Sequence, residues 1–141
     1  MSNQNIKTAV ILAAGRGTRL GDRTKEMPKG FLEVGGETLI ERSIRLLKSS
    51  GIEEIIVGVG HKGTAYEDIQ EKYDLTIFYN DEYSTTESMY TLVCAAPHVS
   101  GDFLLLESDL LYDVSALQTI LNSQHANVIL GSGFTDSGDE V

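Results

Sequence analysis

One stretch near the N-terminus, residues 12–29, most limits what this chain can fold into. The apolar run at residues 9–12, Ala-Val-Ile-Leu, ends in two alanines, and Gly15 and Gly17 follow. A buried strand that gives way to small residues and glycines predicts a loop whose backbone can approach a ligand closely. Five of the eleven basic residues lie here, namely Arg16, Arg19, Arg23, Lys25 and Lys29. Because the formal net charge of the chain is -10, this basic loop predicts an anion-binding site.

The composition favours one domain that binds a small molecule. With 141 residues, 41% of them hydrophobic, the chain is long enough for one sizeable core. The pI of about 4.6 argues against nucleic acid as a partner, because duplex binding depends on Lys and Arg. No apolar run approaches the roughly twenty residues of a membrane span, and the N-terminus lacks a signal-peptide core. The single Cys94 fits a reducing compartment. We therefore expect a cytoplasmic protein without membrane contact, and the sequence leaves a homo-oligomer open.

Strand and helix patterns alternate along the chain. Strands are predicted at residues 6–12, 54–60, 75–79, 103–107 and 127–131. Helices are predicted at 38–49, at 64–73, over about ten residues that include 89–96, and at 114–123. Thr38 and Glu41 have capping-box spacing, Gly51 can end the first helix, and Pro97 should stop the third. This order predicts an α/β fold, a three-layer α/β/α sandwich around a mostly parallel sheet.

In such a sheet, ligands bind beyond the carboxyl ends of the strands. This rule selects the loops after Leu12, Tyr79 and Leu106. The loop after Leu12 departs from the dinucleotide-binding fingerprint, because Leu20 stands at the third glycine. It fits instead the pattern Gly15-x-Gly17-x-Arg19-x-x-x-x-Thr24-x-x-x-Pro28-Lys29.

This pattern closely resembles the signature of the nucleotidyltransferases that release pyrophosphate from a nucleoside triphosphate. They include the sugar-1-phosphate nucleotidylyltransferases and the related cytidylyltransferases. The resemblance implies a Rossmann-like sheet of the nucleotide-diphospho-sugar transferase type, in one nucleotidyltransferase domain over residues 1–141. We expect this domain to continue past Val141, because the polar tail follows directly on a predicted strand; a flexible terminus is the alternative.

The resemblance also assigns roles to residues. The glycine-rich loop would cover the triphosphate, Arg19 would contact its outer phosphates, and Lys29 would reach the reacting phosphate. Arg19 and Lys29 are thus the expected catalytic residues, since fixed cations offset the repulsion between two polyanions. The expected substrate-binding residues are Leu12, Ala13, Ala14, Gly15, Arg16, Gly17, Thr18, Ser88, Glu107 and Tyr112.

Asp109 is the expected Mg²⁺ ligand. It follows a hydrophobic strand, and a carboxylate there can take Mg²⁺ together with substrate phosphates. The alternative is an Asp that caps the next helix. Glu107 has three possible roles. It could support the metal ligand, contact the amine of the acceptor, or be a buried acid at the end of the strand. The resemblance places a second metal-binding aspartate beyond residue 141.

Residues 80–92 and 107–113 resemble the branch that makes CDP-activated small amino compounds, from phosphocholine or 2-aminoethylphosphonate. Glu87-Ser88 and Glu107-Ser-Asp109 depart from the phosphocholine pattern. We therefore expect CTP and a small anionic acceptor as substrates, with 2-aminoethylphosphonate favoured. A sugar-1-phosphate nucleotidylyltransferase and a non-catalytic nucleotide-binding module are the alternatives.

Several side chains near these loops allow two interpretations. Ser88 and the backbone of residues 13–15 would contact the cytosine, but Thr86 and Ser88 fit a capping role equally well. An acceptor ammonium group would be met by carboxylates or aromatic faces. The residues that offer them are Tyr83, Glu107, Tyr112 and Asp113. We interpret His61 as a loop residue and Cys94 as a residue packed within a helix.

Overall fold

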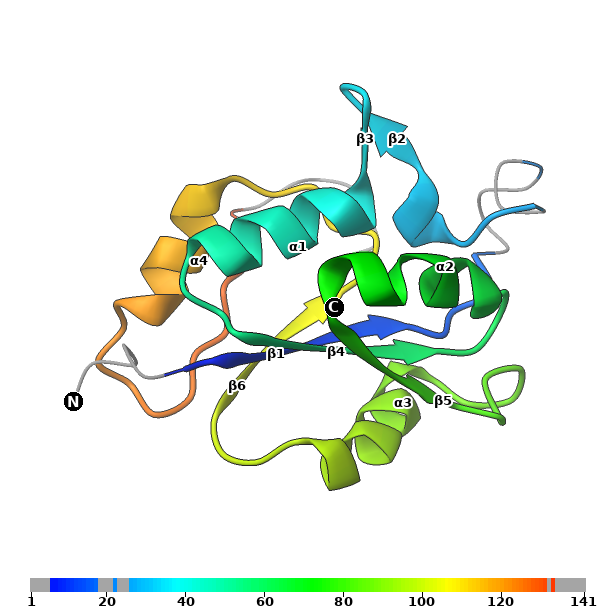
Figure 1. Ribbon diagram of the computed structural model, residues 1–141. Helices are drawn as coiled ribbons and strands as arrows, with labels where there is room; N and C mark the ends of the chain where they lie inside the picture. The colour runs from blue at the N-terminus through cyan, green and yellow to red at the C-terminus, as the bar shows by residue number, and fades with distance from the viewer. Residues whose placement is uncertain (1–5, 18–21, 23–25, 132, 134–141) are drawn as a thin grey trace.

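The computed structural model describes residues 6–17, 22, 26–131 and 133. A four-stranded sheet runs through the centre of the molecule (Figure 1). Its strands are β1 (Thr8–Ala13), β4 (Glu54–Val59), β5 (Leu75–Tyr79) and β6 (Phe103–Glu107). They lie in the order β5-β4-β1-β6, and every neighbouring pair is parallel. The predicted α/β fold is confirmed.

Helices cover the two faces of the sheet and complete three layers. On one face lie α1 (Leu39–Ser49), α2 (Thr64–Tyr73) and α4 (Val114–Leu121), and on the other lies α3 (Ser88–Ala95) (Figure 1). The larger core lies beneath α1 and α2, and the smaller one lies beneath α3. Strand β1 is buried along its whole length and supplies both cores. Its carboxyl end therefore opens at the middle of the sheet edge.

Helix α1 begins and ends as its sequence predicts. The backbone N–H of Glu41 donates to the Thr38 hydroxyl at 3.2 Å, and this hydroxyl donates to the Glu41 carboxylate at 2.9 Å. At the other end, Gly51 has a φ of +93°, a conformation that glycine adopts without steric cost.

The predicted strand at residues 127–131 is wrong. These residues form no strand, and Ile129 is 96% exposed. An apolar run becomes a strand only where a sheet edge accepts its hydrogen bonds. Within the part of the chain described here, 127–131 pairs with no such edge.

The sequence analysis missed several short elements. They are the 3₁₀ turn η2 (Lys29–Phe31), the hairpin of β2 (Glu33–Val34) with β3 (Glu37–Thr38), and the turn η3 (Ala96–His98) after α3. Gly35 and Gly36 connect the hairpin strands with φ values of +65° and +84°. Over the described ranges, no helix is both long and apolar enough to cross a membrane.

Candidate active site

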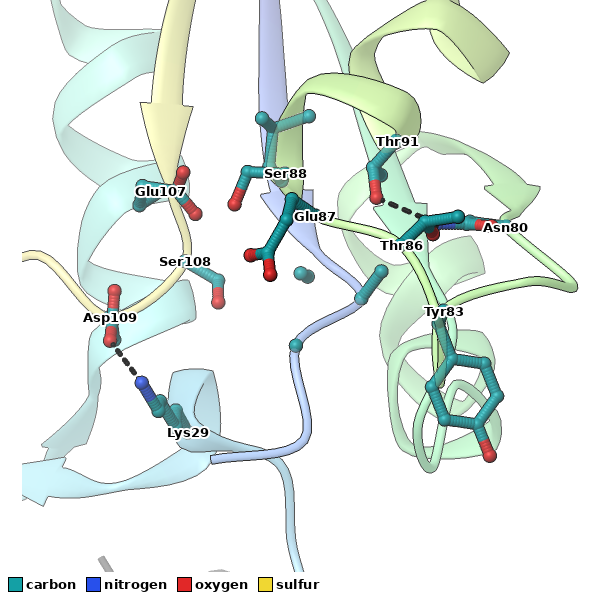
Figure 2. Close-up of a pocket in the computed structure, with 14 residues that line it drawn as sticks. Lys29, Asn80, Tyr83, Thr86, Glu87, Ser88, Thr91, Glu107, Ser108 and Asp109 are labelled. Carbon is teal, nitrogen blue, oxygen red and sulfur yellow. Dashed lines mark hydrogen bonds and ion pairs between the residues drawn. The ribbon is translucent and has the colours of Figure 1, made fainter. Parts of the chain in front are cut away.

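A pocket of about 140 Å³ lies at the carboxyl end of the sheet (Figure 2). It brings together the three loops that the strand-end rule selected, which follow β1, β5 and β6. Its walls are formed by Leu12, Ala13, Ala14, Gly15, Lys29, Asn80, Tyr83, Thr86, Glu87, Ser88, Thr91, Glu107, Ser108 and Asp109.

Small residues from the end of β1 form one wall. A Cβ built on Gly15 would meet no atom within 4 Å, so internal crowding does not explain the glycine. It leaves open space where a ligand can approach the backbone. Gly17 has a φ of +65°, which glycine adopts readily and most other residues do not.

Lys29 and Asp109 form an ion pair on one side of the pocket. The ammonium Nζ of Lys29 donates to Oδ2 of Asp109 at 3.1 Å, and both side chains are partly exposed (Figure 2). Pro28, with a φ of -67°, precedes the η2 turn and holds Lys29 on a restricted backbone. The η2 turn thus directs Lys29 to the pocket, where the ammonium group pairs with Asp109.

The Glu107 carboxyl lies on the same side of the pocket. Its pKa is raised above the ordinary value, mainly because the pocket walls remove water from the carboxylate, although part of the side chain stays exposed. The nearby Ser88 hydroxyl lowers the pKa, the charge of Asp109 raises it, and Lys29 lowers it. Three charged side chains thus interact within one small space.

The opposite side of the pocket is neutral and hydrogen-bonded. Asn80, which is 1% exposed, uses its amide nitrogen to donate to the hydroxyls of Thr86 and Thr91, each at 3.0 Å. Its amide oxygen accepts from the backbone N–H of Glu82 at 2.9 Å. This network holds the loop after β5 against the start of α3.

The domain's relatives identify its family. The profile described as MobA-like NTP transferase domain matches residues 9–132. The chain belongs to this family. It is 35% identical over 97 residues to choline-phosphate cytidylyltransferase from Streptococcus pneumoniae, which covers 69% of this chain and 42% of that protein. It is 32% identical over 129 residues to CTP:phosphoglutamine cytidylyltransferase from Campylobacter jejuni, covering 86% and 51%.

A solved structure of a cytidylyltransferase is also similar to this chain. The structure of CTP:phosphocholine cytidylyltransferase from Streptococcus pneumoniae matches with a TM-score of 0.69 and 34% identity, over 74% of this chain and 46% of that one. Relatives at 32% identity include 2-aminoethylphosphonate cytidylyltransferase from Lancefieldella rimae and a UTP--glucose-1-phosphate uridylyltransferase from Haloferax volcanii. These two cover 77% and 76% of this chain and 45% of their own lengths. The chain thus spans about half the length of the curated relatives it matches.

Eight of the thirteen residues predicted for the site of this NTP transferase domain line the pocket. They are Leu12, Ala13, Ala14, Gly15, Lys29, Ser88, Glu107 and Asp109. Arg16 and Gly17 follow the pocket wall in the loop after β1 without being part of it. Thr18 and Arg19 lie outside the described residues.

Tyr112 is placed away from the pocket. Its ring packs against the larger core, and its buried hydroxyl lies beside Ser43 of α1. Burial raises the pKa of Tyr112. The sequence put Tyr112 near the end of β6, but the chain turns toward α1 before reaching it.

The structure tests the helix-capping alternative for several site residues. The N-cap of α4 is Asp113, which accepts from the N–H of Ser115 at 2.9 Å, so Asp109 does not cap that helix. The N-cap of α3 is Glu87, which makes no side-chain capping bond. The Thr86 hydroxyl instead donates to the Glu82 carbonyl at 2.8 Å. The Thr86 hydroxyl is thus held by Glu82 and Asn80 rather than by the end of α3.

The expected places of His61 in a loop and of Cys94 within a helix are confirmed, and Tyr83 is found to line the pocket. His61 lies in the turn after β4, where burial and the charges of Lys62 and Arg16 lower its pKa. Cys94 lies within α3 and packs partly buried against the smaller core. Tyr83 lines the pocket, with its ring 6.0 Å from that of His61.

Sequence reasoning did not assign Asn80, Glu87, Thr91 or Ser108 to the site, although all four line it. Their position directly after a strand, or at the start of the next helix, was the available signal. Asn80 is the clearest case, since it is the first residue after β5.

Proposed function

We propose that this domain carries the nucleotide site of a cytidylyltransferase. The enzyme transfers CMP from CTP to a small phosphonate or phosphate acceptor and releases pyrophosphate, with 2-aminoethylphosphonate the favoured acceptor and phosphocholine the next. The observation that carries the proposal is the pocket at the ends of β1 and β6. It combines an open glycine wall with the facing Lys29 and Asp109 side chains.

The reaction sets clear electrostatic demands. An acceptor oxygen forms a bond to the α-phosphorus of CTP while the bond from that phosphorus to the pyrophosphate oxygen breaks. Both reactants are anions, so a cation must lie between them. Lys29 reaches the pocket from the η2 turn and is positioned to bind the phosphate oxygens. Arg19 is proposed as the second cation on the outer phosphates.

Asp109 fits a Mg²⁺ ion that the triphosphate shares. Among the described residues, no group of three or more His, Cys, Asp or Glu side chains could hold a metal on its own. Mg²⁺ does not need such a group, because it keeps several waters and binds through one or two carboxylates and substrate phosphates. Asp109 supplies one carboxylate at the pocket edge. Bound there, the ion would neutralise charge on the departing pyrophosphate.

The wall formed by the end of β1 and the start of α3 suits the base. We place the cytosine against the backbone of residues 13–15 and the hydroxyl of Ser88, which line the pocket together. An acceptor amine would then approach the carboxylate of Glu107 or the ring of Tyr83. The names of three relatives support CTP as the nucleotide, and their acceptors differ.

A sugar-1-phosphate nucleotidylyltransferase is the second candidate. It is favoured by the uridylyltransferase relative, which matches with the same 32% identity as the 2-aminoethylphosphonate enzyme. A module that binds nucleotide without catalysis is the third candidate.

Pyrophosphate release tests these candidates directly. The protein from its whole gene is assayed with CTP, UTP, GTP, dTTP and ATP against 2-aminoethylphosphonate, phosphocholine and several sugar phosphates. The proposal predicts turnover with CTP and an aminophosphonate, lost in EDTA and restored by Mg²⁺. Turnover with UTP and a sugar phosphate alone would replace it with the second candidate. Nucleotide binding without turnover would favour the third.

A further inference from the structure

Behind the Lys29 and Asp109 pair lies a buried tyrosine that the sequence analysis did not assign to the site. Tyr66, in the first turn of α2, is fully buried. Its ring packs edge to face on Phe31, with 5.0 Å between the ring centroids. Its hydroxyl oxygen makes no hydrogen bond of good geometry among the residues that the structure describes, although the Ser108 side chain and the Gly30 backbone lie close enough to interact with it.

This hydroxyl lies between the segments that carry the two charged groups. A Cβ built on Gly30, the neighbour of Lys29, would come within 2.6 Å of the Tyr66 hydroxyl oxygen. The same Cβ would lie 3.4 Å from the carbonyl oxygen of Ser108, the neighbour of Asp109. Hydrogen-bonding interactions with the Ser108 side chain and the Gly30 backbone lower the pKa of Tyr66, against the larger raising effect of burial.

Steric contact with Tyr66 therefore explains why position 30 holds a glycine. The φ of Gly30 is not positive, so its backbone would accept another residue. The Tyr66 oxygen occupies the volume that a side chain at position 30 would need. The two residues are complementary in size, and together they set the distance between the η2 turn and the end of β6.

The phenol oxygen is a costly group to place there. A buried hydroxyl with poorly aligned hydrogen bonds contributes little to stability, and a phenylalanine would keep the contact with Phe31 without burying a polar atom. Burial raises the pKa of Tyr66 to about 12, so the hydroxyl is neutral under ordinary conditions. The oxygen therefore lies between the two segments that carry Lys29 and Asp109, which points to a role at the site rather than in the core.

We propose that Tyr66 is a positioning residue for the Lys29 and Asp109 pair. Its hydroxyl fills the space left by Gly30 and keeps the η2 turn at the separation at which Lys29 Nζ contacts Asp109 Oδ2. This inference rests on the proposed function, because the separation matters for turnover only if these two groups act on the substrates.

The first test is Tyr66→Phe in the protein from its whole gene. We expect the melting temperature to change little, because the polar atom that is removed is buried and makes no hydrogen bond of good geometry. We expect kcat to fall about tenfold, since small displacements of reacting groups cost that much or more, with the KM for CTP changed less than twofold. An unchanged kcat would overturn the proposal.

Tyr73→Phe is the matched control on the same helix. The Tyr73 hydroxyl donates to the Glu41 carboxylate at 2.8 Å, at the end of α2 distant from the pocket. Its removal should lower the melting temperature and leave kcat unchanged. Equal losses of kcat in the two variants would mean that α2 affects turnover only through stability, and would contradict the proposal.

Gly30→Ala tests the size complementarity by rescue. In the single variant the new methyl group collides with the Tyr66 oxygen. We therefore expect a loss of kcat larger than that of Tyr66→Phe. In the double variant the methyl group replaces the missing oxygen. We expect its kcat to recover to within a few-fold of the wild type. A double variant no better than Gly30→Ala would refute the complementarity.

A readout without turnover separates this inference from the proposed function. The acetylation rate of Lys29, measured by mass spectrometry relative to Lys7, reports how firmly Asp109 holds the ammonium group. We expect it to rise several-fold in Tyr66→Phe and to stay unchanged in Tyr73→Phe. If no nucleotide is turned over, the proposed function fails while this rate still tests the positioning. An unchanged rate refutes it even in an active enzyme.

Discussion

The two sides of the pocket differ in how their polar groups are satisfied. On the neutral side, Asn80 and Thr91 are almost fully buried, and the Asn80 amide makes three hydrogen bonds. On the charged side, Lys29, Asp109 and Glu107 keep exposed surface, and a single ion pair joins two of them. Satisfied buried groups maintain shape, whereas exposed charges are available to a ligand. We therefore expect substitutions on the neutral side to cost stability and those on the charged side to cost turnover.

The largest effect is expected from Lys29→Ala. Loss of a cation that faces developing phosphate charge should lower turnover on the order of 10² to 10³-fold. The melting temperature should change little, because a partly exposed ion pair contributes at most about 1 kcal/mol. Pyrophosphate release and thermal melting measure the two quantities. Lys7→Ala, which breaks the pair with Glu53 at the amino end of the sheet, is the control. Near-normal turnover would show that Lys29 is not a catalytic group.

Asp109→Asn should have the next largest effect. The amide removes the negative charge of the proposed metal ligand, so the Mg²⁺ concentration for half-maximal turnover should rise about 10- to 100-fold. The measurement is a Mg²⁺ titration of pyrophosphate release. Asp113→Asn, which weakens the α4 cap, should lower stability without moving this concentration. Equal Mg²⁺ dependence in wild type and Asp109→Asn would exclude Asp109 as a ligand.

Asn80→Ala tests the neutral side. It removes three hydrogen bonds and leaves the buried Thr91 hydroxyl without its Asn80 donor. The free energy of unfolding should fall by about 2 to 3 kcal/mol, measured by denaturant titration. Turnover well below the melting temperature should fall less than about tenfold. Asn127→Ala, at an exposed position, should change stability by less than about 0.5 kcal/mol. Full stability with lost turnover would contradict the division of roles.

The smallest effect is expected from Glu107→Gln and depends on pH. The folded-state pKa of Glu107 is raised, first by burial, so the folded protein holds this proton more tightly than the unfolded chain does. The resulting stabilisation is present below the ordinary pKa and is lost as the pH rises through the folded value. At pH 7 the variant should therefore melt slightly above the wild type, and near pH 4 the difference should shrink. A variant that is less stable at pH 7 would show that another contact of Glu107 dominates.

The elements that sequence predicted best are those with a full hydrophobic period. Helix α2 and strand β5 have the bounds that their apolar spacing indicates. The hairpin of β2 and β3 was missed because strands of two residues carry no period. The strand at 127–131 was wrongly predicted because its pattern is local, while pairing needs an edge elsewhere in the chain.

At the candidate site, too, local patterns predicted the loops and residues, whereas long-range contacts could not be predicted. Its three loops follow from the rule on strand ends, and Lys29 and Asp109 were both singled out from their motifs. Their contact joins residues 80 positions apart and depends on how η2 packs against β6. The role of Tyr66 was beyond sequence reasoning, because it depends on a glycine in another element.

The central claim is that the pocket at the carboxyl end of the sheet holds the nucleotide. A titration of the isotope-labelled protein with CTP and Mg²⁺, followed by backbone amide shifts, tests it most directly. We predict the largest shifts at residues 13–15, 86–91 and 109. Lys7, Gly51 and Leu121, which line a second hollow at the amino end of the sheet, should not shift. Shifts centred on that second hollow, or none at millimolar CTP, would contradict the claim.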